Sequence, residues 1–453
     1  MSKYIQEDRI IRKLKKKIPW TSHLTESVRV GLDLNVTEEL KTITPKGSLC
    51  TTCKGTRMLC RKARCPIITR IYTYLRIKSK VENIQIDGSS PPGVFVGRIG
   101  YPYIYAGPLV PPFYGNTSHF DRSEEWFGKT IDEIVDFRFK LVRGKYRVNV
   151  NEPEKAGRIL EDMRFLAMAD RTVDVELSLK KKPNYHFVLD DNVQLIGPSA
   201  PMKDIKIGNF KLEPRIEKAH YDYDLKAADA VLKLYKSGVL VSKLQKALSV
   251  GAFGIKGQRR LVPTRWSITA TDSMISQSLM ETIKTFPLIN KFRIYESNYL
   301  DNRFEVLMIP DSWKYEAMEA WYPGTIWNSN SSKIFLIGDW ESYSGRTKYA
   351  GMGGCYYAAR LAVNEKLIKE RRQATVIVLR EAHKGYIMPV GVWQVRENVR
   401  NALRGDPFKY DKMEDVLKHL SAKFEIQLKS WIENSKILKD TLVQTKLSNY
   451  FKS

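Results

Sequence analysis

The sequence lacks long apolar runs, and this absence limits the kinds of protein that it can encode. A helix that spans a bilayer needs about 20 consecutive apolar residues, and the 453-residue chain contains no such run. The N-terminus is charged from Lys3 onward and has no apolar core typical of a secretory signal. We therefore expect a soluble, cytoplasmic protein with no membrane partner.

Histidine is scarce, and common catalytic motifs are missing. The 6 histidines form no paired metal-ligand spacing, which argues against a zinc metalloprotease. Gly128-Lys129-Thr130 resembles the end of a P-loop, but Ser123 stands where the first glycine of that motif belongs, so we expect a helix start instead. Many carboxylates could hold Mg²⁺ in a nuclease, but their order singles out no set. They include Asp121, Asp190, Asp191, Asp222, Asp224, Asp301, Glu316, Glu319, Asp339 and Glu341.

Cysteine is rare, with 5 in the whole chain. Four of these cysteines fall in one short segment, namely Cys50, Cys53, Cys60 and Cys65. Disulfide frameworks spread their cysteines along a chain, so this clustering predicts a metal site. Four thiolates match the closed tetrahedral coordination of structural zinc, which leaves no open position for a substrate. An iron–sulfur cluster with the same ligands is one alternative, and metal-free thiols or disulfides are the other.

Positive charge is what the sequence has in excess, with a formal net charge of +25. Residues 1–80 hold 19 Lys/Arg against 6 Asp/Glu, whereas residues 411–453 hold 8 against 6. So basic a chain is expected to bind a polyanion such as DNA. The asymmetry predicts a DNA-facing N-terminal region and a protein-facing C-terminus. A generally basic, solvated surface is the alternative.

Strand-like and helix-like patterns alternate along the chain, which predicts an α+β fold with a mixed α/β body. Short strands joined by tight turns are expected over 88–115, and further strands near Phe304, Ile334 and Val376. Helical patterns cover 123–175, 225–248 with a break near Gly238, 272–284 and 355–370.

These patterns predict four regions. They are a basic N-terminal region over 1–80 with a small four-cysteine zinc-binding module at 46–70, a mixed core over 81–410, an amphipathic C-terminal helix over 411–442 and a flexible tail over 443–453. The helix is expected because apolar residues recur at three- and four-residue steps through 411–442.

One segment of the core carries side chains suited to nucleic acid. Arg265 can fork onto a phosphate and Trp266 can stack on a base. Asp272 is expected at the N-cap of the helix that follows. The alternative is a buried tryptophan with a structural arginine.

A second segment is rich in glycine and precedes a predicted helix. Arg346 and Lys348 come before a turn that contains Gly353 and Gly354. Such a turn offers free N–H groups and the positive end of the helix dipole, which together suit a phosphate. A tight turn that only packs closely is the alternative.

The end of the chain has a pattern suited to a pocket on another protein. In a 3₁₀ turn, residues three apart share one face, so Gln444, Leu447 and Tyr450 would line up with Phe451 beside them. The segment resembles the PCNA-interacting peptide, Gln-x-x-(Leu/Ile/Met)-x-x-aromatic-aromatic, by which replication and repair proteins bind the sliding clamp. The alternative is that these side chains fold back onto the core.

Several motifs together resemble the archaeal Nre family of DNA repair proteins. They are the cysteine cluster, PGVFVGRIGYP at 92–102, VPTRWSIT at 262–269, YYAARL at 356–361 and GVWQVRE at 391–397. The resemblance covers nearly the whole chain, and the final residues resemble the clamp-binding tail of the NreA branch. It implies a role in DNA repair, with PCNA contacts at Gln444, Leu447, Tyr450 and Phe451, and it implies no catalytic residue.

We therefore expect a DNA repair protein that is recruited by PCNA and holds DNA on a basic surface. One alternative is an enzyme that processes nucleotides or DNA by metal-dependent phosphoester hydrolysis. Its phosphate site would lie around Arg98, Arg265, Arg346 and the 351–354 turn, with Mg²⁺ as cofactor. The other alternative is a non-catalytic scaffold that holds another repair enzyme beside the clamp.

Overall fold

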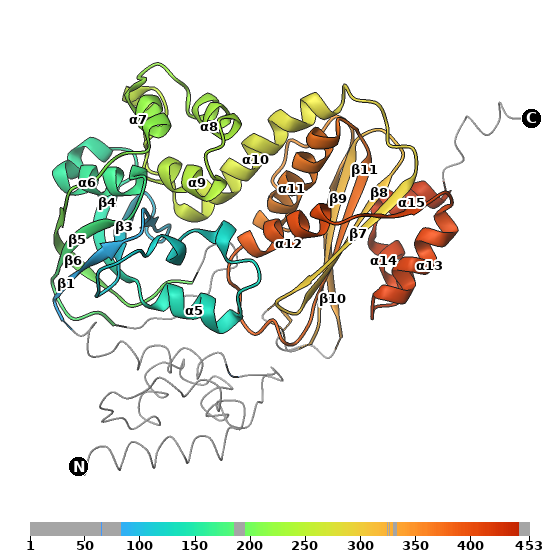
Figure 1. Cartoon of the computed structure of the whole chain (residues 1–453), viewed down its shortest axis with the longest axis horizontal. Helices are drawn as coiled ribbons and strands as arrows, with labels where there is room; N and C mark the ends of the chain where they lie inside the picture. The colour runs from blue at the N-terminus through green and yellow to red at the C-terminus, as the bar shows by residue number, and fades with distance from the viewer. Residues whose placement is uncertain are drawn as a thin grey trace, which may run out of the picture. The chain divides into compact units, whose positions relative to one another are not determined.

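The computed structural model describes Cys65 and residues 83–184, 195–323, 325, 327, 328 and 333–443. The chain divides into two compact units (Figure 1). The first runs to Thr271 and also holds Ile387–Gly391, and the second holds Asp272–Tyr386 and the chain from Val392 onward. Helix α10 (Thr264–Ile283) passes through this division. The core predicted over 81–410 is thus divided between two units.

The first unit is built on a mixed sheet. Its strands are β1 (Gln85–Ser90), β2 (Val94–Val96), β3 (Tyr103–Val110), β4 (Val142–Asn149), β5 (Val173–Leu179) and β6 (Ser199–Ile207). They lie in the order β1-β5-β6-β4-β3-β2, with β4 parallel to β6 and the other neighbours antiparallel. Strands β1, β2 and β3 confirm the short strands expected over 88–115.

Helices connect and cover these strands. They are α5 (Ile131–Phe139), α6 (Gly157–Met168), α7 (Pro214–Tyr221), α8 (Ala227–Lys236) and α9 (Val241–Ser249), with short 3₁₀ turns η2 (Ser118–Phe120), η3 (Ser123–Glu125), η4 (Pro153–Ala156) and η5 (Lys256–Gln258). The predicted helix start at Thr130 is confirmed, because its side chain and that of Glu133 form a capping box for α5. The predicted break at Gly238 is also confirmed, since this glycine has φ +87° between α8 and α9.

The helical pattern predicted over 123–175 is wrong in its middle. Strand β4 separates α5 from α6 and pairs with β3 on one side and β6 on the other. Sheet pairing and burial outweigh local helix propensity there, because tertiary contacts stabilise more than intrinsic preference does.

The second unit is built on another mixed sheet. Its strands are β7 (Phe292–Tyr299), β8 (Asn302–Ile309), β9 (Lys314–Trp321), β10 (Phe335–Glu341), β11 (Thr375–Ala382) and β12 (Phe408–Tyr410). The order is β10-β9-β11-β8-β7-β12, with β11 parallel to β9 and the other neighbours antiparallel. Strands β8, β10 and β11 confirm those predicted near Phe304, Ile334 and Val376.

Helices cover both faces of this second sheet (Figure 1). The second half of α10, α11 (Gly354–Glu370) and α12 (Trp393–Arg404) pack on one face. Three C-terminal helices, α13 (Met413–Lys423), α14 (Leu428–Asn434) and α15 (Lys436–Val443), pack on the other. Alternate residues of β11 therefore serve different cores, with Val376 and Val378 in the first and Ile377 and Leu379 in the second.

The single amphipathic helix predicted over 411–442 is wrong, because the chain breaks after α13 and again before α15. Phe424 and Ser435 adopt extended backbone at these breaks. The Phe424 side chain is nevertheless buried, as the apolar pattern predicted, and the polar Ser435 side chain is buried too. The pattern identified the face that packs on the sheet but not the interruptions of the helix.

Two buried carboxylates of the sheet stabilise the breaks. Glu381 accepts the N–H of Ile426 at 2.9 Å, just before α14. Glu316 accepts the N–H groups of Lys436 and Ile437 at 2.7 and 3.0 Å, at the start of α15. A carboxylate at a helix N-terminus satisfies otherwise unpaired donors and complements the helix dipole.

The predicted α+β class, with a mixed α/β body, is confirmed. In the described part of the chain, every helix is too short or too polar to cross a bilayer.

Candidate nucleic-acid interface

The first turn of α10 holds both predicted residues, Trp266 exposed and Arg265 half-buried. The hydroxyl oxygen of Thr264 accepts the N–H of Val96 at 2.9 Å, which ties the start of α10 to β2. Trp266 is 46% exposed, and its ring lies 5.3 Å from the ring of Tyr101. The alternative of a buried tryptophan is therefore wrong, and the indole is open to a further partner.

The turn before β3 brings Arg98 and Tyr101 to the same region. Gly100 has φ +82°, and its carbonyl oxygen accepts the N–H of Tyr103 at 2.9 Å. A positive φ of this size suits glycine because it has no Cβ. Arg98 and Tyr101 are both exposed around this tight turn.

Strands β3 and β4 extend this surface. Tyr103 and Tyr105 are exposed while Ile104 between them is buried. The Arg147 guanidinium lies over the ring of Tyr103, 5.3 Å from its centroid, and Arg147 stands opposite Tyr105 in the register. We call this surface the aromatic–basic patch and define it as Arg98, Tyr101, Tyr103, Arg147, Arg265 and Trp266.

Further along β4, positive charges stand close together. Burial lowers the pKa of Lys145, and the neighbouring charges of Arg143 and Lys181 lower it further. The Arg143 side chain donates to the carbonyl oxygen of Tyr105 at 2.7 Å, which holds it against β3. Arg143 and Lys181 thus disfavour the charged form of Lys145, and a polyanion bound at Lys145 would favour it.

The chemistry of the aromatic–basic patch suits nucleic acid with accessible bases. Aromatic rings stack on bases whatever their sequence, and arginines contact phosphates and ring faces. Each stacked base contributes about 1–3 kcal/mol to binding. Intact duplexes hide the faces of their bases, so rings of this kind favour single-stranded or distorted DNA.

The second predicted phosphate segment lies in the other unit, where an internal carboxylate already occupies it. Asp339 accepts the N–H of Gly351 at 2.7 Å and a guanidinium N–H of Arg346 at 2.8 Å. Burial alone would lower the pKa of Arg346, but the hydrogen bond to Asp339 raises it. Gly353 has φ +67° and leads into α11, whose first residue is Gly354. A tight turn closed by Asp339 accounts for this motif.

Lys348 is exposed beside this turn, and its carbonyl oxygen accepts the Nε–H of Arg346 at 2.7 Å. The predicted phosphate residues therefore form two separate groups. Arg98, Arg265 and Trp266 belong to the first unit, and Arg346, Lys348, Gly353 and Gly354 belong to the second.

Asp272 does not cap a helix, and that prediction is wrong. Helix α10 begins eight positions earlier at Thr264, so Asp272 lies inside it. Its carboxylate is fully buried and accepts two hydrogen bonds from Arg396, each of 3.0 Å. The helix continues through Asp272 because tertiary pairing satisfies the carboxylate.

Several carboxylates considered for Mg²⁺ are engaged in internal ion pairs. Asp121 pairs with Arg138 and Lys246, Glu319 pairs with Arg380, and Glu341 pairs with Arg360. Asp190 and Asp191 lie outside the described residues. The structure thus gives Asp121, Glu319 and Glu341 roles in packing.

The clamp tail and most of the cysteine cluster lie outside the described residues. They are Gln444, Leu447, Tyr450, Phe451, Cys50, Cys53 and Cys60. Cys65 is described, and its side chain is buried. The predicted zinc and PCNA contacts therefore remain predictions.

Sequence reasoning missed Tyr101, Tyr103 and Arg147 as members of the patch. The available signal was the alternation of aromatic residues in 101–105, which predicted a strand with one outer face. The missing information was which face would remain uncovered, and this depends on the packing of the whole unit.

Comparison with family models matches most of the chain. The model for the N-terminal part of archaeal Nre matches residues 59–328, and the model for its C-terminal part matches residues 341–450. The N-terminal match therefore extends beyond Thr271 into the second structural unit.

Three curated relatives match over most of their length. The DNA repair protein NreB of Archaeoglobus fulgidus is 40% identical over 86% of this chain and 97% of its own. The DNA repair protein NreA of the same organism is 35% identical over 84% of this chain and 95% of its own. The DNA repair protein NreA of Haloferax volcanii is 33% identical over 78% of this chain and 86% of its own. No solved structure matches the chain.

Proposed function

The chain belongs to the archaeal Nre family, and on this premise we propose that it is a DNA repair factor. It binds DNA with exposed bases through the aromatic–basic patch, and its C-terminal tail recruits it to the sliding clamp PCNA. The repair role is supported by its relatives, which carry the name DNA repair protein. The observation that carries the DNA contact is the exposed Trp266 ring beside Tyr101.

The patch has the combination that single-strand binding requires. Trp266 and Tyr101 supply ring faces, and the Arg147 guanidinium lies over the ring of Tyr103. Phosphate contacts release counterions, so binding weakens as salt increases. Stacking adds a preference for unpaired bases that does not depend on sequence.

This proposal is tested by measuring the binding of fluorescent oligonucleotides to the full chain at several salt concentrations. We expect single strands and duplexes with an unpaired bubble to bind more tightly than intact duplex. The double substitution Tyr101→Ala/Trp266→Ala should weaken binding to single strands at least tenfold, since it removes about 1–3 kcal/mol for each stacked base.

Tyr114→Ala is the matched control, because Tyr114 is 64% exposed and follows the opposite end of β3 from Tyr103. It should bind as the unaltered protein does. Equal loss in both variants, or equal affinity for bubble and intact duplex, would contradict the patch as the DNA contact.

The proposed clamp contact is supported by the sequence of the tail alone. Gln444, Leu447, Tyr450 and Phe451 fill every defined position of the PCNA-interacting peptide. Replacing Tyr450 and Phe451 with alanine should abolish binding to immobilised PCNA and leave single-strand binding unchanged. Retained PCNA binding would place the contact elsewhere in the chain.

We also propose structural zinc at Cys50, Cys53, Cys60 and Cys65, supported by the spacing of four thiolates. Metal analysis of the purified protein should find zinc, and Cys53→Ser should hold one zinc fewer for each chain than the unaltered protein. Iron and sulfide in place of zinc, with a coloured protein, would favour the iron–sulfur alternative.

A further inference from the structure

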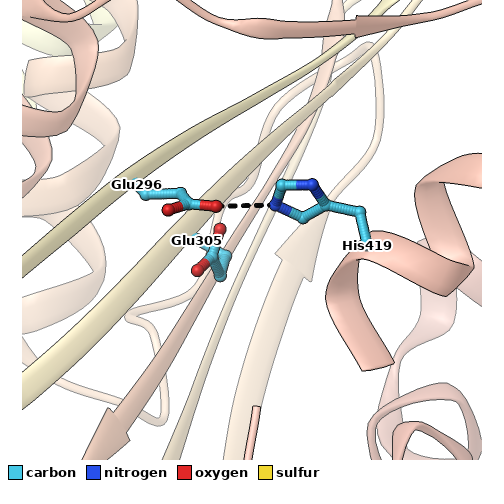
Figure 2. A group of neighbouring side chains, drawn as sticks. All are labelled: Glu296, Glu305 and His419. Atoms are coloured by element: carbon cyan, nitrogen blue, oxygen red, sulfur yellow. Dashed lines mark hydrogen bonds and ion pairs between the residues drawn. The ribbon is translucent and has the colours of Figure 1, made fainter. Parts of the chain in front are cut away.

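Two glutamates and a histidine meet on the face of the second sheet that α13–α15 cover. Glu296 comes from β7, Glu305 from β8 and His419 from α13 (Figure 2). One side-chain oxygen or nitrogen atom from each lies within 4.8 Å of the others. We call this group the Glu–Glu–His cluster.

The strand register brings the two carboxylates together. Glu296 stands directly opposite Glu305 in the antiparallel pairing of β7 with β8. Like charges in directly opposed positions destabilise a sheet. Such a pair needs a proton or a cation between its members.

Glu305 is the residue whose charge lacks compensation. It is 1% exposed, and its Oε2 atom has no hydrogen-bond partner among the described residues. Buried polar atoms are nearly always satisfied, so an unpartnered carboxylate oxygen in a cluster of donor atoms calls for a ligand.

The other two members are held in position by further contacts. Within the cluster, the Nε2 atom of His419 lies 2.7 Å from Glu296 Oε1, a contact that a bound ion would replace. From outside the cluster, the hydroxyl of Tyr410 lies 2.8 Å from His419 Nδ1. Lys423 donates to Glu296 Oε2 at 2.9 Å. Outer contacts of this kind orient imidazole and carboxylate ligands in metal sites.

Charges around the cluster come from each element packed there. Arg303 on β8 and Lys423 on α13 supply positive charge near Glu305, and Glu381 on β11 supplies negative charge. The ring of Phe408 lies 4.8 Å from that of His419 and covers one side. Although Arg303 and Lys423 are near, neither forms a direct ion pair with Glu305 in the described part of the chain.

We propose that Glu296, Glu305 and His419 bind a divalent first-row transition-metal ion that joins α13 to the sheet. Imidazole nitrogen and carboxylate oxygen together suit Mn²⁺ or Zn²⁺, whereas Mg²⁺ prefers oxygen ligands and water. An ion with ligand bonds of about 2.0–2.2 Å holds its donor atoms at most about 4.4 Å apart. The donor atoms of the cluster lie within 4.8 Å of one another, so small side-chain movements bring all three to one ion. The proposal does not depend on DNA or PCNA binding.

The test uses the full chain and Mn²⁺, because thiolates such as those of the cysteine cluster bind Mn²⁺ poorly. The protein is dialysed against a chelator and titrated with Mn²⁺, and the free ion is measured by electron paramagnetic resonance. We expect one Mn²⁺ to bind each chain. Glu305→Gln, which keeps the shape of the side chain, should weaken that binding at least tenfold.

Tyr410→Phe removes an outer contact and no ligand, so it should weaken Mn²⁺ binding by about tenfold, and Glu305→Gln should weaken it more. His383→Gln is the control, since His383 lies on the same unit and contacts Glu381 and Glu425 instead. It should bind Mn²⁺ as the unaltered protein does. Mn²⁺ should also raise the melting temperature of the unaltered protein but not of Glu305→Gln.

Absence of stoichiometric Mn²⁺ binding would overturn the proposal. Binding that is equal in the unaltered protein and in Glu305→Gln would overturn it too, because the ion would then occupy another site. Circular dichroism of each variant before titration separates loss of a ligand from loss of the fold.

Discussion

The aromatic–basic patch of the first unit and the interior of the second unit use charge in opposite ways. In the patch, Arg147 lies beside Tyr103 on an exposed face. In the second unit, Arg360 and Glu341 are 1% and 0% exposed and lie 2.7 Å apart. Exposed cations are available to a partner, whereas buried ion pairs maintain the fold. Removing one member of a buried pair lowers the free energy of unfolding much more than removing one member of an exposed pair.

The largest expected effect is the loss of a buried cation. Arg360→Met leaves Glu341 buried, and among the described residues only the hydroxyl of Tyr356 then donates to it, at 3.0 Å. Breaking such a pair costs about 3–5 kcal/mol. We expect a loss of this size in the free energy of unfolding, measured with urea.

Lys206→Met is the matched change in the first unit, where Lys206 and Glu176 are 72% and 58% exposed and 3.7 Å apart. That pair contributes about 0–1 kcal/mol. The double substitution Arg360→Met/Glu341→Gln should recover part of the loss. A similar loss in Arg360→Met and Lys206→Met would contradict the distinction between buried and exposed charge.

A smaller effect is expected at the carboxylate that begins α15. Glu316→Ala leaves the N–H groups of Lys436 and Ile437 without their acceptor. An unsatisfied buried donor costs about 1–3 kcal/mol, and the urea midpoint should decrease accordingly. Glu433→Ala, at a 60% exposed position on α14, should leave the midpoint nearly unchanged. If both variants retain full stability, Glu316 does not anchor the helix.

Removing one exposed cation should change binding but not stability. Arg147→Gln should weaken single-strand binding several-fold and reduce the slope of log affinity against log salt by about 0.7, as expected for one phosphate contact. Titration with a labelled single strand measures both quantities. Arg171→Gln, at a 77% exposed arginine outside the patch, should keep the original slope. An unchanged slope in Arg147→Gln would remove this arginine from the interface.

The smallest expected effect is a dependence on pH at His383. Burial lowers the pKa of His383, but its hydrogen bond to Glu381 and the nearby charge of Glu425 raise it overall above the usual 6.5. The protonated histidine therefore stabilises the folded state below pH 6.5, and this contribution disappears as the pH rises through the folded pKa. His383→Gln should lose stability mainly at low pH, as urea unfolding across this range can measure. A stability difference that increases with pH would reverse the assignment.

Local signals predicted much of the fold. The break at Gly238 follows from the backbone freedom of glycine, and the start of α5 follows from the capping residues Thr130 and Glu133. Strands β8 and β11 follow from short apolar runs. Such features depend on residues that are neighbours in sequence, so no knowledge of the packed structure was needed.

The candidate sites were predicted less completely. Trp266 and Arg265 were identified because their chemistry is distinctive, but Tyr101 and Arg147 join them only once α10 is tied to β2. The predicted role of Asp272 at a helix start was wrong because Arg396, far away in the sequence, pairs with it inside α10. Residues that act through distant partners carry no local signal.

The sequence by itself determined the family, the mixed α/β class and the excess of positive charge, because each depends on composition or on short patterns. Which charges are buried and which remain exposed follows from the packing of the folded chain. Glu296, Glu305 and His419 demonstrate this, since a strand register and a helix crossing bring them within 4.8 Å. The physical reason is that burial and electrostatic pairing depend on distances in space, which sequence separation does not specify.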